Sequence, residues 1–490
     1  MKKTHILCIF AALITSWISS CKSDDDNNGG ASNQEINSWI YENMKTYYLW
    51  TDYITSKPNY ASNPETFFES LLYTKEDRFS WIQENYTDLL NTLNGVTSKE
   101  IGFEYTLWWK SNRQDSLIIE VSYPKNGTDA KAKGIERGDF ITSVNGKAIT
   151  KSNYKTIFSD NSSSYQLLVS KNLGAGKLST PSTITVTPIA GYAENPVYLY
   201  KTISTTAGNV GYLAYHFFAD DSGDSTRRYD KELVAALSDF NNQNINNLVL
   251  DLRYNSGGAI SSAVILASAL VKSRTEDLLF ARNEYNKEIT TFLTQKYGAN
   301  SLNDYFINNF TPEYPANSAA ISIPNLGDKL NHIYILTGRY TASASELIIN
   351  GLKPYMNITL IGDSTYGKNV GSISIYDETS KTNKWGMQPI VTKIYNSKNQ
   401  SDYANGFAPD YAADDNYDSS NGYVRVHKPL GDENEYLLNI ALNLIQGSML
   451  RSRIDNSAFT KRVMKPNFNP EGRSFDMYIN NKHLLKKRLN

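Results

Sequence analysis

Cysteine is almost absent from this sequence of 490 residues, which holds only Cys8 and Cys21. Both lie in or directly after an apolar N-terminal stretch that has the character of an export leader. After removal of that leader and modification of Cys21, no thiol would remain for a disulfide, a catalytic cysteine or a thiolate metal site. Histidine is scarce too, with five in the whole chain, so catalysis by histidine has few candidates.

An excess of charge of either sign is also missing, since 49 lysines and arginines stand against 50 aspartates and glutamates. Such a balance creates no overall field that would attract nucleic acid or an acidic partner. We therefore do not expect nucleic acid to bind. The sequence also shows no cluster of metal ligands, and we expect neither a metal nor a cofactor.

Residues 1–20 have the pattern of a secretion signal. Two lysines precede the apolar run ILCIFAALITSWI, which is too short and wrongly flanked for a membrane span. The run ends in ISSC, which resembles the lipobox of bacterial lipoproteins, and the DDD that follows resembles the surface-export signal of Bacteroidetes lipoproteins. These resemblances imply lipidation of Cys21 and a protein of the cell envelope, anchored to the outer membrane on its periplasmic face or at the cell surface. A soluble export signal with an incidental cysteine is the alternative.

The rest of the chain divides by composition and periodicity. The polar, glycine-rich residues 21–34 are predicted to form a flexible tether. Residues 35–95 repeat apolar side chains at three- and four-residue steps, which predicts a small helical module. Short β-like runs in residues 96–195 predict a β domain. Residues 196–450 alternate apolar strands with helices, which indicates an α/β core whose partly parallel sheet is covered on both faces. Residues 451–490 hold ten basic and three acidic side chains and are predicted to be a solvated basic tail.

The β domain contains AKAKGIERGDFITSVNGKAI, which resembles a PDZ domain of the bacterial-protease type. The resemblance implies that the segment IGFE, namely Ile101, Gly102, Phe103 and Glu104, forms the loop that receives the C-terminal carboxylate of a peptide. Backbone N–H groups would hold the carboxylate while the peptide adds as an edge strand. A PDZ-like domain that serves only as a spacer or latch is the alternative.

The segment GDSTYGKNVGS, which contains Lys368, nearly fits the phosphate loop G-x-x-x-x-G-K-[ST]. Asn369 stands where that loop carries its magnesium-binding hydroxyl, the strand NLVLDLR precedes the segment instead of following it, and an exported protein meets no nucleotide pool. The phosphate-loop hypothesis therefore fails. A buried lysine can instead act as a base, because burial disfavours the charged ammonium, and we expect Lys368 to pack under Tyr366.

A second segment, TASASE, places Ser343 at the start of a predicted helix. With Glu346 three positions on, Ser343 fits a capping box. The same position suits a nucleophile, because free N–H groups and the positive end of the helix dipole stabilise an oxyanion. Ser345 is the other candidate nucleophile, and His216 is the base that a Ser-His arrangement would need.

Three motifs in order resemble the C-terminal processing (tail-specific) proteases, peptidase family S41. These are NLVLDLRYNSGGAI, TASASE and GDSTYGK, with Lys368 standing 25 positions after Ser343. The resemblance implies a multi-domain α/β protein with a ClpP/crotonase-like protease core, in which Ser343 is the nucleophile and Lys368 the general base. It also implies an oxyanion hole formed by the N–H of Ala344 with that of Gly257 or Gly258.

One position departs from the family pattern. Better-studied members carry a glutamine four residues after the lysine, and here Ser372 stands there. A serine is shorter, so the third catalytic role stays open. Two functions follow: a serine endopeptidase that cleaves exported polypeptides and recognises their C-termini, or a catalytically impaired lipoprotein that holds peptide or glycan with its PDZ-like groove and its Tyr-rich insertion at residues 282–326. The Ser–Lys spacing favours the enzyme, and Ser372 favours the binding protein.

Overall fold

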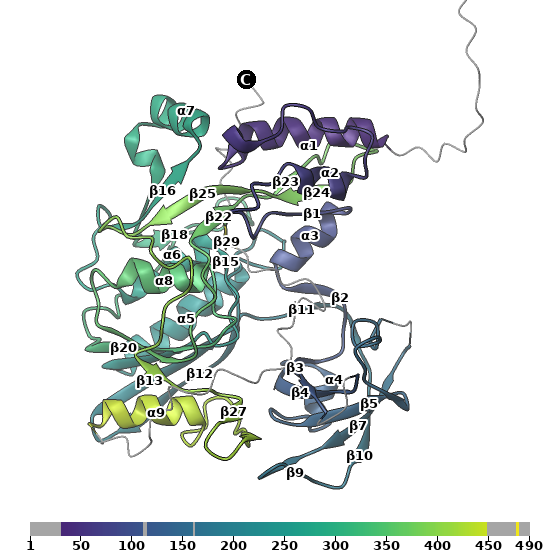
Figure 1. Ribbon diagram of the computed structural model, residues 1–490. Helices are drawn as coiled ribbons and strands as arrows, with labels where there is room; N and C mark the ends of the chain where they lie inside the picture. The colour runs from purple at the N-terminus through teal and green to yellow at the C-terminus, as the bar shows by residue number, and fades with distance from the viewer. Residues whose placement is uncertain (1–30, 111–114, 160–161, 448–476, 480–490) are drawn as a thin grey trace, which may run out of the picture.

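The computed structural model describes residues 31–110, 115–159, 162–447 and 477–479. Cys21 and the predicted leader lie outside these residues, as do most of the predicted tether and basic tail. The described chain is a multi-domain α/β protein, with a helical module, a β domain and a larger α/β core (Figure 1). Among the described residues, no helix combines the length and apolar character needed to cross a bilayer.

The N-terminal module is built on amphipathic helices, as predicted. Ser32 and Glu35 form a capping box at the start of the first helix, and Asn63 with Pro64 opens the second. The structure adds a short strand, β1, which pairs antiparallel with a strand of the core, so the module is joined to the core by backbone hydrogen bonds. The elements are α1 (Asn33–Tyr47), α2 (Pro64–Ser70), β1 (Trp81–Gln83), α3 (Tyr86–Leu93) and the core strand β24 (Gly386–Gln388).

The β domain holds one antiparallel sheet in the order β10-β7-β5-β4-β3. Every residue of β4 is buried, which places this strand at the centre of the domain core. In the described part of the chain no strand pairs with the outer edge of β3. The strands are β3 (Phe103–Trp109), β4 (Leu117–Pro124), β5 (Phe140–Val144), β7 (Tyr165–Ser170) and β10 (Ser182–Val186), and β2 (Val96–Glu100) pairs with β11 (Ile189–Ala193) where the domain leaves and returns to the core.

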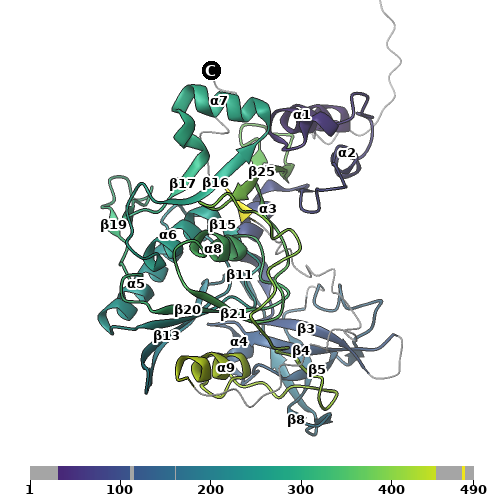
Figure 2. The same cartoon turned by 60° about the vertical axis from the view of Figure 1, so that its left-hand side comes forward.

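The core contains a six-stranded sheet in the order β12-β13-β14-β20-β21-β26, parallel except for the first pair. As predicted, helices cover both faces: α5, α6 and α8 pack on one and α9 on the other (Figure 2). The elements are β12 (Val197–Thr205), β13 (Gly208–Tyr215), α5 (Arg228–Asn242), β14 (Asn247–Asp251), α6 (Ile260–Leu270), β20 (His332–Thr337), α8 (Ala344–Leu352), β21 (Ile358–Gly362), β26 (Tyr411–Ala412) and α9 (Tyr436–Ile445).

A second six-stranded sheet has the order β15-β29-β22-β25-β16-β17. Its strand β29 comes from the predicted basic tail, and Met477 and Tyr478 are 0% and 4% exposed. The prediction of a solvated tail is wrong for these residues, because the average charge of the tail hides the apolar triplet Met-Tyr-Ile. The strands are β15 (Gly258–Ala259), β16 (Leu279–Tyr285), β17 (Asn303–Tyr305), β22 (Val370–Ser372), β25 (Ile390–Tyr395) and β29 (Met477–Tyr478).

The Tyr-rich insertion supports the N-terminal module. Its helix α7 (Lys287–Tyr297) packs against α1, and Ile289 and Leu293 share one apolar cluster with Ile40 and Met44. In Figure 1 the two helices lie side by side at the top of the molecule. The insertion therefore provides a surface against which the apolar face of the module is buried, and short helices need such packing to be stable.

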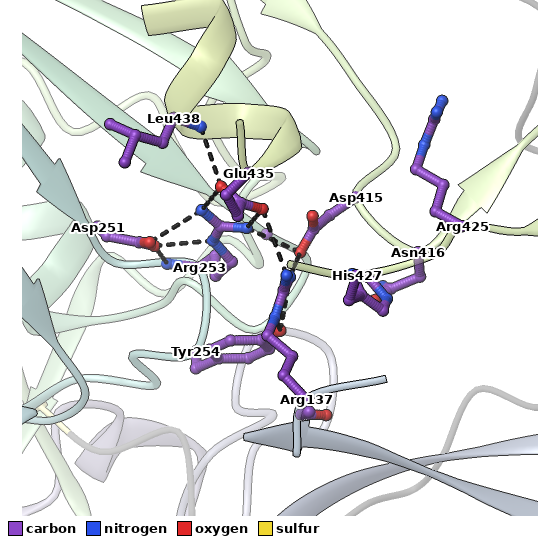
Figure 3. Close-up of polar contacts among 12 residues, drawn as sticks. Arg137, Asp251, Arg253, Tyr254, Asp415, Asn416, Arg425, His427, Glu435 and Leu438 are labelled. Carbon is purple, nitrogen blue, oxygen red and sulfur yellow. Dashed lines mark hydrogen bonds and ion pairs between the residues drawn. The ribbon is translucent and has the colours of Figure 1, made fainter. Parts of the chain in front are cut away.

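A buried ion network connects the β domain to the core (Figure 3). Arg137 of the β domain donates to Asp415 at 2.7 Å, and Arg253, which follows β14, donates to the same carboxylate oxygen at 3.0 Å. Arg253 also makes two bonds each to Asp251 and Glu435. Burial alone would raise the pKa of Asp415, but the charges of Arg137 and Arg253 hold it well below its ordinary value. Because such charges are stable away from water only when all are paired, the network fixes the β domain to the core.

Replacing Arg137 by alanine should weaken this connection. The change leaves a buried carboxylate short of one partner, a loss that costs about 3–5 kcal/mol. We expect a lower free energy of unfolding in urea and faster proteolysis between the β domain and the core. Lys133→Ala is the matched control, since its ion pair with Asp129 is exposed and worth less than about 1 kcal/mol. Equal effects of the two changes would contradict a structural role for Arg137.

Candidate active site

Ser343 stands on a strained turn between β20 and α8, as the helix-start prediction requires. Its φ and ψ are 62° and −117°, a conformation that residues other than glycine rarely adopt. Thr341 donates its hydroxyl to the Leu252 carbonyl at 2.7 Å and thereby anchors the turn. Ser343 is fully buried, and its hydroxyl has no hydrogen-bond partner among the described residues. The turn therefore holds an unused hydroxyl beside the first N–H groups of a helix.

Glu346 connects the serine turn to the lysine segment. Ser343 and Glu346 are placed as a capping box, in which only the bond from the Ser343 N–H to the Glu346 carboxylate, at 2.8 Å, has full hydrogen-bond geometry. The same carboxylate accepts the N–H groups of Gly367 and Lys368, each at 2.8 Å, and the Thr365 hydroxyl at 2.6 Å. The sequence predicts Glu346 only as a cap, because the pattern S-x-x-E carries no information about a segment twenty residues further on.

The carboxylate of Glu346 lies in a dry environment. Burial raises its pKa to about 7, although the hydrogen bonds from Thr365, Lys368, Ser343 and Gly367 all favour the ionised form. Four donors around one carboxylate leave no room for a proton without the loss of a bond. Burial nevertheless outweighs these bonds, so the folded chain favours the protonated form of Glu346 up to about pH 7.

Lys368 is 1% exposed and lies on the segment between β21 and β22. The aromatic ring that faces it is Phe79 of the N-terminal module, whose centroid is 4.9 Å from Nζ. Tyr366, predicted for this role, is 38% exposed, and its ring packs at a steep angle to that of Phe79 with the ring centroids 6.1 Å apart. Arg78 donates to the carbonyls of Gly367 and Ala404 at 2.6 and 2.9 Å. The N-terminal module thus shapes the lysine segment, a contact across 289 positions that local sequence patterns cannot reveal.

The structure brings Ser343 and Lys368 onto one carboxylate but shows no hydrogen bond between their side chains, since the Ser343 hydroxyl has no partner in the described chain. Bonds between a nucleophile and its base are commonly longer in free enzymes than in complexes with substrate. Glu346 holds both residues through their backbone N–H groups.

Hydrogen bonds of Asn255 connect the glycine turn after β14 to the serine turn. The Asn255 side chain accepts the Gly257 N–H at 2.9 Å, and its carbonyl accepts the Ala342 N–H at 3.2 Å and the Ser345 hydroxyl at 3.1 Å. The N–H of Gly257 is therefore already used. Gly258 has φ of 132°, and a Cβ there would lie 1.9 Å from the Phe218 carbonyl oxygen, so no other residue fits.

The other candidate residues have different surroundings. Ser345 donates its hydroxyl within the glycine turn. His216 stacks on Tyr198 at 4.6 Å and lies 3.7 Å from Glu194, at the junction with the β domain, and no hydrogen bond joins it to Ser343 in the described chain. The structure gives no support to a Ser-His pair. The hydroxyl of Ser372 donates to the Met477 carbonyl at 3.2 Å.

The predicted carboxylate loop is largely buried. Ile101 and Phe103 belong to the apolar core of the β domain, and the side chain of Glu104 is 38% exposed. The Gly102 N–H donates to the carboxylate of Glu100 at 2.8 Å, and Glu100 is paired with the buried Lys125. The loop therefore already holds a carboxylate, one that comes from the chain itself.

Family models confirm the resemblance seen in the motifs. A model described as "Peptidase family S41" matches residues 209–413, and one described as "Peptidase S41 N-terminal domain" matches residues 35–81. This chain belongs to peptidase family S41. The two matched ranges contain the serine turn, the lysine segment, the glycine turn, Arg78 and Phe79.

Individual relatives agree with the family assignment. The chain is 22% identical over 341 residues to a carboxy-terminal-processing protease of Bartonella bacilliformis, which covers 67% of this chain and 64% of the relative. It is 25% identical over 383 residues to a probable CtpA-like serine protease of Staphylococcus aureus, in an alignment that covers 74% of this chain and 62% of the relative. The chain thus spans less than two thirds of the length of these two curated relatives. A crystal structure from Bacteroides fragilis, named as an S41 protease, is 27% identical with a TM-score of 0.65 and covers 84% of this chain and 97% of its own.

The pKa of Glu346 generates a testable prediction about stability. Its pKa in the folded chain, about 7, lies above the ordinary 4.5, so the stabilisation that protonated Glu346 contributes is present at low pH and is lost as the pH rises through about 7. Relative to Glu346→Gln, which does not titrate, the wild type should lose roughly 3 kcal/mol of unfolding free energy between pH 4.5 and 8. Urea denaturation at several pH values measures this difference.

Glu433→Gln, on the exposed loop before α9, controls for the loss of one carboxylate. A wild type that becomes more stable relative to Glu346→Gln as the pH rises would contradict the raised pKa of Glu346.

Proposed function

We propose that this S41 chain is a serine endopeptidase that cleaves exported polypeptides through an acyl-enzyme. The observation that carries the proposal is the Glu346 carboxylate, which binds the backbone N–H groups of Ser343 and Lys368 at 2.8 Å each. A carboxylate shared by both backbones supports the assignment of these two residues to a common site. The leader and the lipidated Cys21 that the sequence predicts support action at the cell envelope.

The chemistry follows from the positions of the groups. Lys368 in its neutral form takes the proton of the Ser343 hydroxyl as Oγ attacks the scissile carbonyl carbon. The N–H groups of Ala344, at the start of α8, and of Gly258 stabilise the oxyanion. Lys368 then gives the proton to the leaving amine as the C–N bond breaks. Water, deprotonated by the same lysine, hydrolyses the ester and restores Ser343.

Exclusion of water is the contribution of the N-terminal module. Lys368 can act as a base only while its amine is neutral, and burial disfavours the ammonium form. Phe79 covers the amine, and Arg78 holds the Gly367 carbonyl so that the segment stays in place. These contacts partly replace the orienting glutamine, at whose position this chain has Ser372, because they hold the lysine segment through its backbone.

Ser343→Ala and Lys368→Ala should each lower kcat/KM for an unfolded polypeptide substrate by at least about a thousandfold, as loss of a nucleophile or its base does. Circular dichroism should show an unchanged fold. Ser364→Ala, a partly exposed serine on the same segment as Lys368, is the matched control and should retain activity. Undiminished cleavage by both active-site variants would refute the Ser–Lys assignment, whereas a wild type that binds the polypeptide without cleaving it would favour the peptide-binding lipoprotein.

We also infer that the β domain binds the C-terminal end of the polypeptide by strand addition to β3, whose outer edge carries no strand in the described residues. A substrate carboxylate would replace that of Glu100 on the Gly102 N–H, next to Lys125. The internal carboxylate supports this hypothesis, because it marks a position that already suits an anion.

Peptides that differ only in a free or amidated C-terminus test this hypothesis. Amidation should lower kcat/KM about tenfold or more, since it removes a charge-assisted hydrogen bond. Glu100→Gln, which weakens the internal competitor, should increase the preference for the free carboxylate, while Glu65→Gln on the exposed start of α2 should leave it unchanged. Equal cleavage of both peptides would rule out capture of the carboxylate, whether or not the Ser–Lys chemistry is correct.

A further inference from the structure

Both edges of the strand β15, which carries Gly258, are occupied. On one edge the Phe218 N–H donates to the Gly257 carbonyl and the Ala259 N–H donates to the Phe218 carbonyl, each at 2.8 Å. On the other edge β29 pairs in parallel, with Met477 opposite Gly258 and Tyr478 opposite Ala259. A substrate backbone cannot pair with β15 while both neighbours are in place.

The edge covered by β29 is the one that matters for an oxyanion. Successive residues of a strand direct their N–H and C=O groups to opposite edges. Since the Gly257 carbonyl and the Ala259 N–H face Phe218, the N–H of Gly258 faces β29. A scissile carbonyl that used this N–H would have to approach from the side where Met477 now lies.

The second neighbour of β29 is the strand that follows the lysine segment. Tyr478 lies opposite Ser372 in β22. The Ile479 N–H donates to the Ser372 carbonyl at 3.0 Å, and the Ser372 hydroxyl donates to the Met477 carbonyl at 3.2 Å. The segment Met477–Ile479 thus bridges β15, which carries Gly258, and β22, which directly follows Lys368 and Asn369.

We propose that the slot between β15 and β22 is the site where the polypeptide backbone of the substrate binds as a strand, and that Met477–Ile479 occupies it as a competing ligand from the same chain. This inference rests on the proposed peptidase function. It assigns the ligand as an extended polypeptide and gives Ser372 a role in place of the missing glutamine, namely the binding of a strand carbonyl.

The side chains of the segment indicate what the slot accepts. Met477 packs into the main apolar cluster of the core, and Tyr478 packs with Leu89, Leu93 and Ala259. An aliphatic residue followed by an aromatic one therefore fits the slot. Two register pairs to β15 and one to β22 hold the strand, so an incoming polypeptide that supplies the same backbone and apolar contacts can take its place.

Two variants of Ile479 in the full chain test the competition. Ile479→Pro removes the N–H that bonds Ser372, and Ile479→Val keeps it. Loss of one hydrogen bond of about 1 kcal/mol should release the segment about fivefold more often, so KM for a polypeptide substrate should fall about fivefold at unchanged kcat. Ile479→Val should match the wild type. A lower kcat without a lower KM in Ile479→Pro would overturn the proposal and make β29 a structural strand.

A binding measurement on Ser343→Ala separates this proposal from the peptidase chemistry. An isotope-labelled synthetic peptide with the sequence of residues 474–484, SFDMYINNKHL, should bind and speed amide exchange of Met477–Ile479 at least tenfold, because it displaces the segment. The same peptide with alanine in place of tyrosine should bind at least fivefold more weakly. Exchange that stays as slow as in β14 whatever is added would overturn the proposal even if the wild type is an active peptidase. Displacement in a wild type that cleaves no unfolded polypeptide substrate would instead refute the peptidase and leave the slot as a binding site.

Discussion

The buried carboxylate of Glu346 is the contact on which the rest of the site depends. Four donors from the serine turn and the lysine segment converge on it, and a charge of this kind is tolerable in a dry interior only when its acceptors are satisfied. The serine turn and the lysine segment are therefore not independent parts. Each is held in position by a group that would be unstable if the other moved away, so the site forms as one unit.

Much of the architecture could be predicted because it depends on patterns of neighbouring residues in the sequence. Helical periodicity identified α1, whose apolar face around Ile40 is buried, and the alternation of apolar strands and helices identified the covered parallel sheet. The helix start at Ser343 followed from its capping pattern. Such features depend on the period of hydrophobic residues and on helix termini, which a single sequence displays directly.

What could not be predicted depends on contacts between distant segments. Nothing around Phe79 shows that its ring faces Lys368, and nothing in the pattern of Glu346 shows that it reaches beyond its own helix. The predicted basic tail failed at Met477 for a related reason: charge averaged over forty residues conceals three that are apolar. The loop at Gly102 likewise looked available, because the sequence does not show that Glu100 turns back onto its N–H.

The N-terminal module and the C-terminal strand β29 both reach the site, with Arg78 and Phe79 contacting the lysine segment and Met477 lying beside Gly258. Contacts between residues so far apart form late in folding, because a long loop must be closed first. During synthesis or export the segment that carries Ser343 emerges well before the one that carries Met477. The glycine strand and the lysine segment thus gain their last neighbour only after residue 477 has been made, and under the proposed competition the slot is filled as soon as that neighbour folds.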